Sequence, residues 1–144
     1  MPTTRLSAAD YRKRMGLSPA NRRAERAPRQ RPVSPLVSSL VFKLSHAGVE
    51  IPRWAGHPGG ELKPVPGRLF RFDLAWPERL VAAEVDGGVW VKGRHNRGKG
   101  MIADSEKYSL AAGLGWRVLR LCDVHVKDGR AVEWIKAALE WRHV

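Results

Sequence analysis

Two short runs of β-prone residues, separated by a Pro-containing turn, most constrain how this chain can fold. They read RLFRFDLAW at residues 68–76 and RLVAAEVDG at residues 79–87. Such runs predict two strands of an antiparallel hairpin, and the turn decides which residues lie opposite each other. A two-residue turn at 77–78 pairs Asp73 with Ala82, whereas a turn one residue later places Asp73 opposite Glu84. A three-residue turn would put these acids on different faces.

In both registers set by these two turn positions, three acids share one face of the hairpin, namely Asp73, Glu84 and Asp86. The opposite face is apolar and consists of Phe70, Phe72, Trp76, Val81 and Val85. Carboxylates that converge repel one another and raise one another's pKa unless a positive charge lies between them. Arg71 could supply part of that charge, and Mg²⁺, which takes oxygen ligands, fits better. The alternative is the solvent-exposed face of an ordinary amphipathic hairpin.

The remaining pattern predicts a mixed α/β domain. Ser34 as N-cap and Pro35 at the first position predict a helix over residues 36–44 that ends at Gly48. The other expected elements are an irregular loop with at most one short strand at 51–68, a basic glycine-rich loop at 88–100, a helix at 101–114, a short buried strand at 116–122 and an amphipathic helix at 128–142. This order predicts one central mixed sheet flanked by helices.

The charge of the chain points to a polyanionic partner. The formal net charge is +12, of which residues 1–33 carry +7, from nine Lys and Arg against two acids. We expect these residues to form a disordered basic arm that contacts phosphates, and the alternative is a solubilising tail. A short helix at residues 7–15, with Ser7 as N-cap, is a further expectation.

Two absences narrow the class of protein. No apolar run approaches the ~20 residues that span a bilayer, so we expect no membrane partner. The only cysteine, Cys122, excludes an intramolecular disulfide and a cysteine-rich zinc site. Both absences predict a cytoplasmic protein.

The segment RFDLAWPERLVAAEVDGG, followed by His95, DSEK and LGWRVLRL, resembles the PD-(D/E)XK nuclease superfamily. More narrowly, it is similar to the branch that contains very-short-patch-repair-like endonucleases and their small phage and bacterial relatives. The resemblance covers about residues 34 to 140 and leaves the basic arm outside. It implies a restriction-endonuclease-like core for residues 34–144, in a bacterium or a phage-infected host cell.

The resemblance also implies roles for individual residues. Asp73 and Glu84 would bind Mg²⁺, for which Mn²⁺ could substitute, and the backbone carbonyl of Val85 would be a third ligand. Asp86 stands where the superfamily has Lys; in the narrower branch such an acid holds a second metal or orients water. Lys107 would replace the missing Lys. Asp104 matches the supporting acid of a D-x-x-R/K pattern on the same helix.

One further departure concerns the first helix of the domain. Relatives often carry a Glu there, whereas the helix at 36–44 has no acid and Val37 or a neighbour takes that place.

The glycine-rich loop is the expected nucleic-acid contact, because glycines let the backbone approach a phosphate and cations follow the strand. The candidate binding residues are Lys92, Arg94, His95, Arg97 and Lys99, together with Arg71. His95 is also the best candidate for protonating the leaving oxygen, and its alternative role is a simple phosphate contact. A flexible solvated loop is the alternative for the whole segment.

These features together predict an Mg²⁺-dependent DNA endonuclease, with branched or mismatched DNA among its candidate substrates, as in junction resolution or repair nicking. Cutting both strands would require a homodimer or two successive visits. One alternative is a DNA-binding module on the same fold that has lost catalysis, because Asp86 replaces the expected Lys. Another is a basic structural or regulatory protein whose acids balance local charge, and RNA is an alternative substrate.

Overall fold

The computed structural model describes residues 7–15, 32–87 and 97–142. In chain order the elements are α1 (Ala8–Arg14), α2 (Pro35–His46), β1 (Arg53–Trp54), β2 (Leu74–Trp76), the 3₁₀ helix η2 (Pro77–Arg79), β3 (Val81–Asp86), α3 (Arg97–Gly113), β4 (Arg117–Cys122), α4 (Asp123–Lys127) and α5 (Arg130–Glu140). The strands form one sheet in the order β1-β2-β3-β4, in which only the β3–β4 pair is parallel. The predicted mixed sheet flanked by helices is therefore confirmed.

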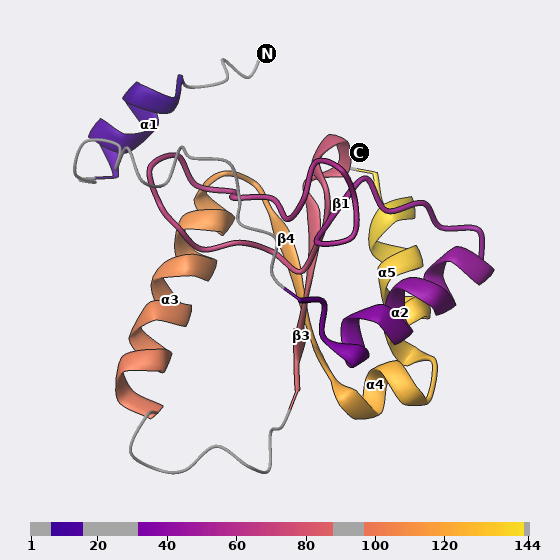
Figure 1. Ribbon diagram of the computed structural model, residues 1–144. Coiled ribbons are helices and arrows are strands. Elements are labelled where there is room, and N and C mark those ends of the chain that lie inside the picture. Colours follow the sequence, from indigo (N-terminus) through magenta and orange to yellow (C-terminus); the bar gives the residue numbers. More distant parts are fainter. Residues whose placement is uncertain (1–6, 16–31, 88–96, 143–144) are drawn as a thin grey trace.

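The sheet separates two layers of helices (Figure 1). On one face, α2, α4 and α5 cover the main core, which includes Leu40, Leu44, Leu74, Val81 and Ile135. Helix α3 lies on the other face and connects β3 to β4. A parallel strand pair needs a crossover of this kind, because the chain must return to the same end of the sheet. Within the described residues, none of the helices is long and apolar enough to cross a membrane.

The hairpin forms with a longer turn than the two-residue alternative. Trp76 pairs with Val81 and Leu74 pairs with Ala83, so residues 77–80 form a four-residue turn. Leu80 closes it in the left-handed conformation, with a φ of 50°. This register is the one that places Asp73 opposite Glu84, and the even number of turn residues keeps the acids on one face.

The first strand of the hairpin is shorter than predicted, and two of its aromatic residues lie on the other side of the sheet. Only residues 74–76 pair with β3; Phe72 instead forms an isolated bridge with Leu62, and its N–H donates to the Leu62 carbonyl at 3.0 Å. The alternation of faces is therefore interrupted before β2. Phe72 packs with Trp116 and Ala111 on the α3 side, and Phe70 packs beside Leu110, so neither belongs to the main core as predicted.

The helices follow their sequence signals closely. The Ser34 hydroxyl accepts a hydrogen bond from the Val37 N–H at 3.1 Å, Pro35 is the first residue of α2, and Gly48 follows with a φ of 78°. Ser7 caps α1 in the same way. Two boundaries differ from the prediction: α3 begins at Arg97, inside the predicted loop, and the short helix α4 precedes α5.

The N-cap of α2 gives a stability prediction. Ser34→Ala removes the hydroxyl that satisfies the Val37 N–H, and we expect it to lower the free energy of unfolding by about 1 kcal/mol. Ser39→Ala is the matched control, because Ser39 is exposed within the same helix, where Ala is the better helix former. Urea denaturation measures both; equal effects of the two variants would contradict the capping role.

Candidate active site

The acidic face of β3 meets one face of α3 in three successive rows. Residues two apart on a strand, and three or four apart on a helix, share a face. In the first row the fully buried Ala82 and Ala111 belong to one apolar cluster. In the second row Glu84 meets Lys107, and in the third Arg120 of β4 joins Asp86 to Asp104.

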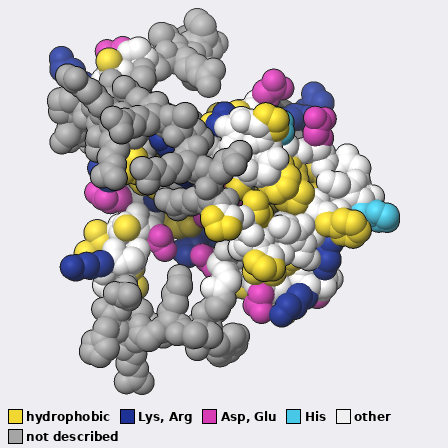
Figure 2. All heavy atoms as spheres, viewed as in Figure 1, with side chains coloured by type: hydrophobic (Ala, Val, Ile, Leu, Met, Phe, Trp, Pro, Cys, Tyr) yellow, Lys and Arg dark blue, Asp and Glu magenta, His cyan; other side chains and the backbone are white. Residues whose placement is uncertain are grey.

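The rows run in opposite directions along the two elements, and α3 diverges from β3 toward the end of the strand (Figure 1). The small alanines bring α3 close to the sheet at the first row, and longer charged side chains bridge the wider separation beyond it. Acidic and basic side chains lie together where α3 faces the sheet (Figure 2). Helical and strand periodicity thus place alternating charges between the two elements.

Asp73 is fixed by the backbone of the neighbouring strand. Its Oδ2 accepts a hydrogen bond from the Val85 N–H at 2.8 Å, which orients the carboxylate beside β3. This bond takes the place of a backbone partner for Val85, so the ladder of β2 and β3 stops at Leu74. Burial raises the pKa of the Asp73 carboxyl above its usual value, against the opposing effects of the Val85 N–H and of Lys107.

Glu84 and Lys107 form a mostly buried ion pair. The Lys107 Nζ donates to the Glu84 carboxylate and, at 2.5 Å, to the backbone carbonyl of Arg71. Both side chains of the pair are only 12% exposed. Burial raises the pKa of the Glu84 carboxyl to about 7, although Lys107 opposes the rise; Asp73 and Asp86 add to it through repulsion. Lys107 therefore reaches the acids from the following helix.

Asp86 has a different cationic partner, Arg120, which the sequence reasoning did not select. The Arg120 Nε and Nη2 atoms lie 3.2 and 3.0 Å from Asp86 Oδ2, and Nη2 lies 3.6 Å from Asp104 Oδ2. The guanidinium also stacks 4.8 Å from the ring centroid of Tyr108. A sequence signal existed, because Arg120 is a charged residue between the apolar residues Leu119 and Leu121 of β4. The parallel register of β3 and β4, which places it beside Glu84, has no such signal.

The donor set fits a hard divalent cation at Asp73 and Glu84. Both are carboxylates, and they lie on the same face. Burial raises the pKa of each, so a nearby cation would stabilise their ionised forms. Mg²⁺ commonly uses one or two protein carboxylates and completes its shell with water and substrate oxygens. In the part of the chain that the structure describes, no group of three or more His, Cys, Asp or Glu side chains is arranged to hold a metal ion. Asp73 and Glu84 are the pair of carboxylates that could hold such a cation.

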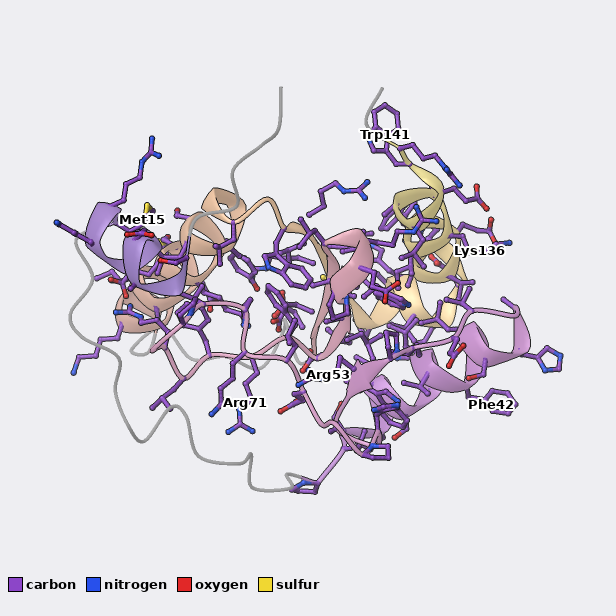
Figure 3. All side chains as sticks on the ribbon, turned by 90° about the horizontal axis from the view of Figure 1, so that it is seen from above. Met15, Phe42, Arg53, Arg71, Lys136 and Trp141 are labelled. Atoms are coloured by element: carbon purple, nitrogen blue, oxygen red, sulfur yellow. The ribbon has the colours of Figure 1, made fainter. Side chains whose placement is uncertain are left out.

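Arg71 does not lie between the acids. Its side chain points away from the sheet (Figure 3), and Nη1 lies 3.5 Å from Glu61 Oε2. The side chain is 15% exposed, and its buried Nε has no hydrogen-bond partner within the described residues. Lys107, rather than Arg71, therefore supplies the positive charge beside Glu84.

The glycine-rich loop lies mostly outside the described residues, and this applies to Lys92, Arg94 and His95. Arg97 begins α3, and Lys99 is exposed in its first turn. Their proposed contacts with nucleic acid remain predictions.

No protein-family model, curated protein or solved structure matches this chain.

The Glu84–Lys107 pair gives a pH-dependent stability prediction. The pKa of Glu84 rises from its ordinary 4.5 to about 7 on folding, so the folded state binds this proton more tightly. The contribution of Glu84 to the free energy of unfolding therefore falls as pH rises from about 4.5 to about 7. Lys107→Met leaves a buried carboxylate unpaired, and we expect a loss of about 3 kcal/mol at pH 8.5. At pH 5.5 the loss should be smaller, because Glu84 can then be neutral.

Urea denaturation at the two pH values measures this difference. Lys136→Met is the control, since Lys136 lies on α5, on the other face of the sheet, and should change stability by less than about 0.5 kcal/mol at either pH. Equal losses for Lys107→Met at pH 5.5 and pH 8.5 would show that the charge on Glu84 is not what Lys107 stabilises.

Proposed function

We propose that this protein is a metal-dependent endonuclease that hydrolyses phosphodiester bonds in DNA, on a restriction-endonuclease-like core. The observation that carries the proposal is the position of Lys107, whose Nζ binds Glu84 beside Asp73. Nucleases of the resembled superfamily combine two acids with a nearby Lys. Here the Lys comes from α3 instead of from the strand, where Asp86 occupies its place. The net charge of +12 supports a polyanionic substrate.

Asp73 and Glu84 would hold the divalent cation, together with the backbone carbonyl of Val85. The bound cation would supply a more acidic water and stabilise negative charge on the phosphate. The Val85 N–H fixes one oxygen of Asp73 and leaves the other for a ligand. Each carboxylate is thus oriented before the substrate arrives, which lowers the reorganisation that the reaction requires.

Lys107 would place a positive charge next to the phosphate. Two of its three N–H donors are used by Glu84 and by the Arg71 carbonyl, so the third can donate to a phosphate oxygen. The ammonium also lies 5.5 Å from the ring centroid of Phe72, which shields one side of it from water. A positive charge in a partly dry site stabilises the developing charge of the transition state more strongly than one in water.

One observation favours the second candidate, a DNA-binding module that has lost catalysis. Glu84 and Asp86 already have cationic partners within the chain, Lys107 and Arg120. Such a site could be stable without any metal. This candidate predicts binding of DNA with or without a divalent cation, and no cleavage.

The proposed activity is tested by incubating supercoiled plasmid with the protein in Mg²⁺, Mn²⁺ or EDTA. We expect metal-dependent nicking that Asp73→Ala and Glu84→Ala each reduce about 100-fold or more. Glu106→Gln is the matched control, because this acid lies beside Lys107 on α3 but pairs with Arg68. Mg²⁺ should also raise the Tm of the unaltered protein and not that of Asp73→Ala. No nicking, with a gel shift unchanged by the variants, would favour the binding module.

Salt dependence tests the proposed DNA contact of the glycine-rich loop. Each phosphate contact contributes about 0.9 to the slope of log K against log salt concentration. The double change Lys92→Gln and Arg94→Gln should lower that slope by about two. The control pair is Lys127→Gln and Lys136→Gln, on α4 and α5 across the sheet from α3. A slope that falls equally in both pairs would argue against a specific contact at the loop.

A further inference from the structure

We infer that Arg120 is the built-in counter-ion of Asp86 and that the active site therefore binds one divalent cation rather than two. This inference rests on the proposed function, since it concerns the same acids. It decides between two roles that Asp86 could have, as a ligand of a second metal or as an acid neutralised by the protein itself.

The geometry gives Arg120 three contacts that fix its guanidinium. Two of its nitrogens donate to one oxygen of Asp86, at 3.0 and 3.2 Å, and one of them also lies 3.6 Å from Asp104. The ring of Tyr108 covers one face of the guanidinium. Arg keeps its charge at neutral pH because of its high pKa, and its planar donors suit carboxylates. A second metal at Asp86 would lie beside this guanidinium, which already neutralises the carboxylate and would repel a further cation.

The sequence positions of these groups explain why Arg120 reaches them. Glu84 and Arg120 are partners in the parallel register of β3 and β4, so their side chains share a face, and Asp86 is two residues further along that face. Asp104 and Tyr108 are four residues apart on α3, so they lie one turn apart on the same side of the helix. Strand and helix thus approach the guanidinium from two sides.

The charge of the cluster is consistent with one cation. Its acids are Asp73, Glu84, Asp86 and Asp104, and its cations are Lys107 and Arg120. Four carboxylates against two cations leave a formal charge of −2 when all groups are ionised, which one divalent ion neutralises. A second divalent ion would leave the cluster positive before any phosphate arrives.

The test counts bound Mn²⁺ per chain by electron paramagnetic resonance, which needs no cleavage. We expect one Mn²⁺ in the unaltered protein and none in Asp73→Asn. Arg120→Gln should bind two, because Asp86 and Asp104 lose their cation, and the added change Asp86→Asn should restore one. Arg120→Lys keeps the charge and should bind one. Arg117→Gln is the control on the same strand, where the side chain instead contacts the Arg79 carbonyl.

The outcomes separate this inference from the proposed function. Two Mn²⁺ in the unaltered protein, or one in Arg120→Gln, would overturn the counter-ion role of Arg120 and leave the endonuclease proposal standing. No bound Mn²⁺ in the unaltered protein would overturn both. Because about half of the Arg120 side chain is exposed, at 49%, Arg120→Gln should fold, and the count in the unaltered protein is informative by itself.

Discussion

Helix α3 packs against the sheet through small apolar residues, and the position of each charged group in the site depends on this contact. Ala75, Ala82 and Ala111 are fully buried, with Phe72 and Trp116 around them. Alanine allows close approach at little cost in side-chain entropy. One turn before Ala111 on α3, Lys107 meets Glu84, two residues after Ala82 on β3. A bulkier residue at this contact would separate the pair.

The charges of this site are tolerated because each has a partner of suitable type, whether it is mostly buried, as Glu84 is, or partly exposed, as Asp86 is. An unpaired carboxylate in a dry site costs several kcal/mol, and such a group would take up a proton instead. Glu84 is balanced by Lys107, whose ammonium is held by Glu84 and by the Arg71 carbonyl. Asp86 is balanced by Arg120, whose guanidinium contacts Asp86, Asp104 and Tyr108. Under the proposed function the two cations have different tasks: Lys107 would donate its remaining N–H to the substrate, and Arg120 would neutralise Asp86 at the end of β3.

Local structure followed from local sequence wherever one signal dominated. Ser34, Pro35 and Gly48 define α2, and the turn at Pro77 forms a hairpin whose even number of turn residues keeps the acids on one face. The prediction was wrong where tertiary pairing overrode the pattern. Phe72 bridges Leu62 instead of extending β2, and Asp73 takes the Val85 N–H, so the first strand is short. The α4 helix was missed because its five residues carry no apolar periodicity.

The sequence by itself determined the mixed α/β class, the basic character of the chain and the shared face of Glu84 and Asp86, because these depend on composition and on periods of two and 3.6 residues. That Asp73 joins this face was decided by the four-residue turn, which sets the register of the hairpin. Only the tertiary structure decided which cation meets which acid. That choice depends on the parallel register of β3 with β4 and on the distance of α3 from the sheet. Both are set by contacts between residues 20 to 40 positions apart, such as Glu84 with Lys107 and Asp86 with Arg120, which no local pattern encodes.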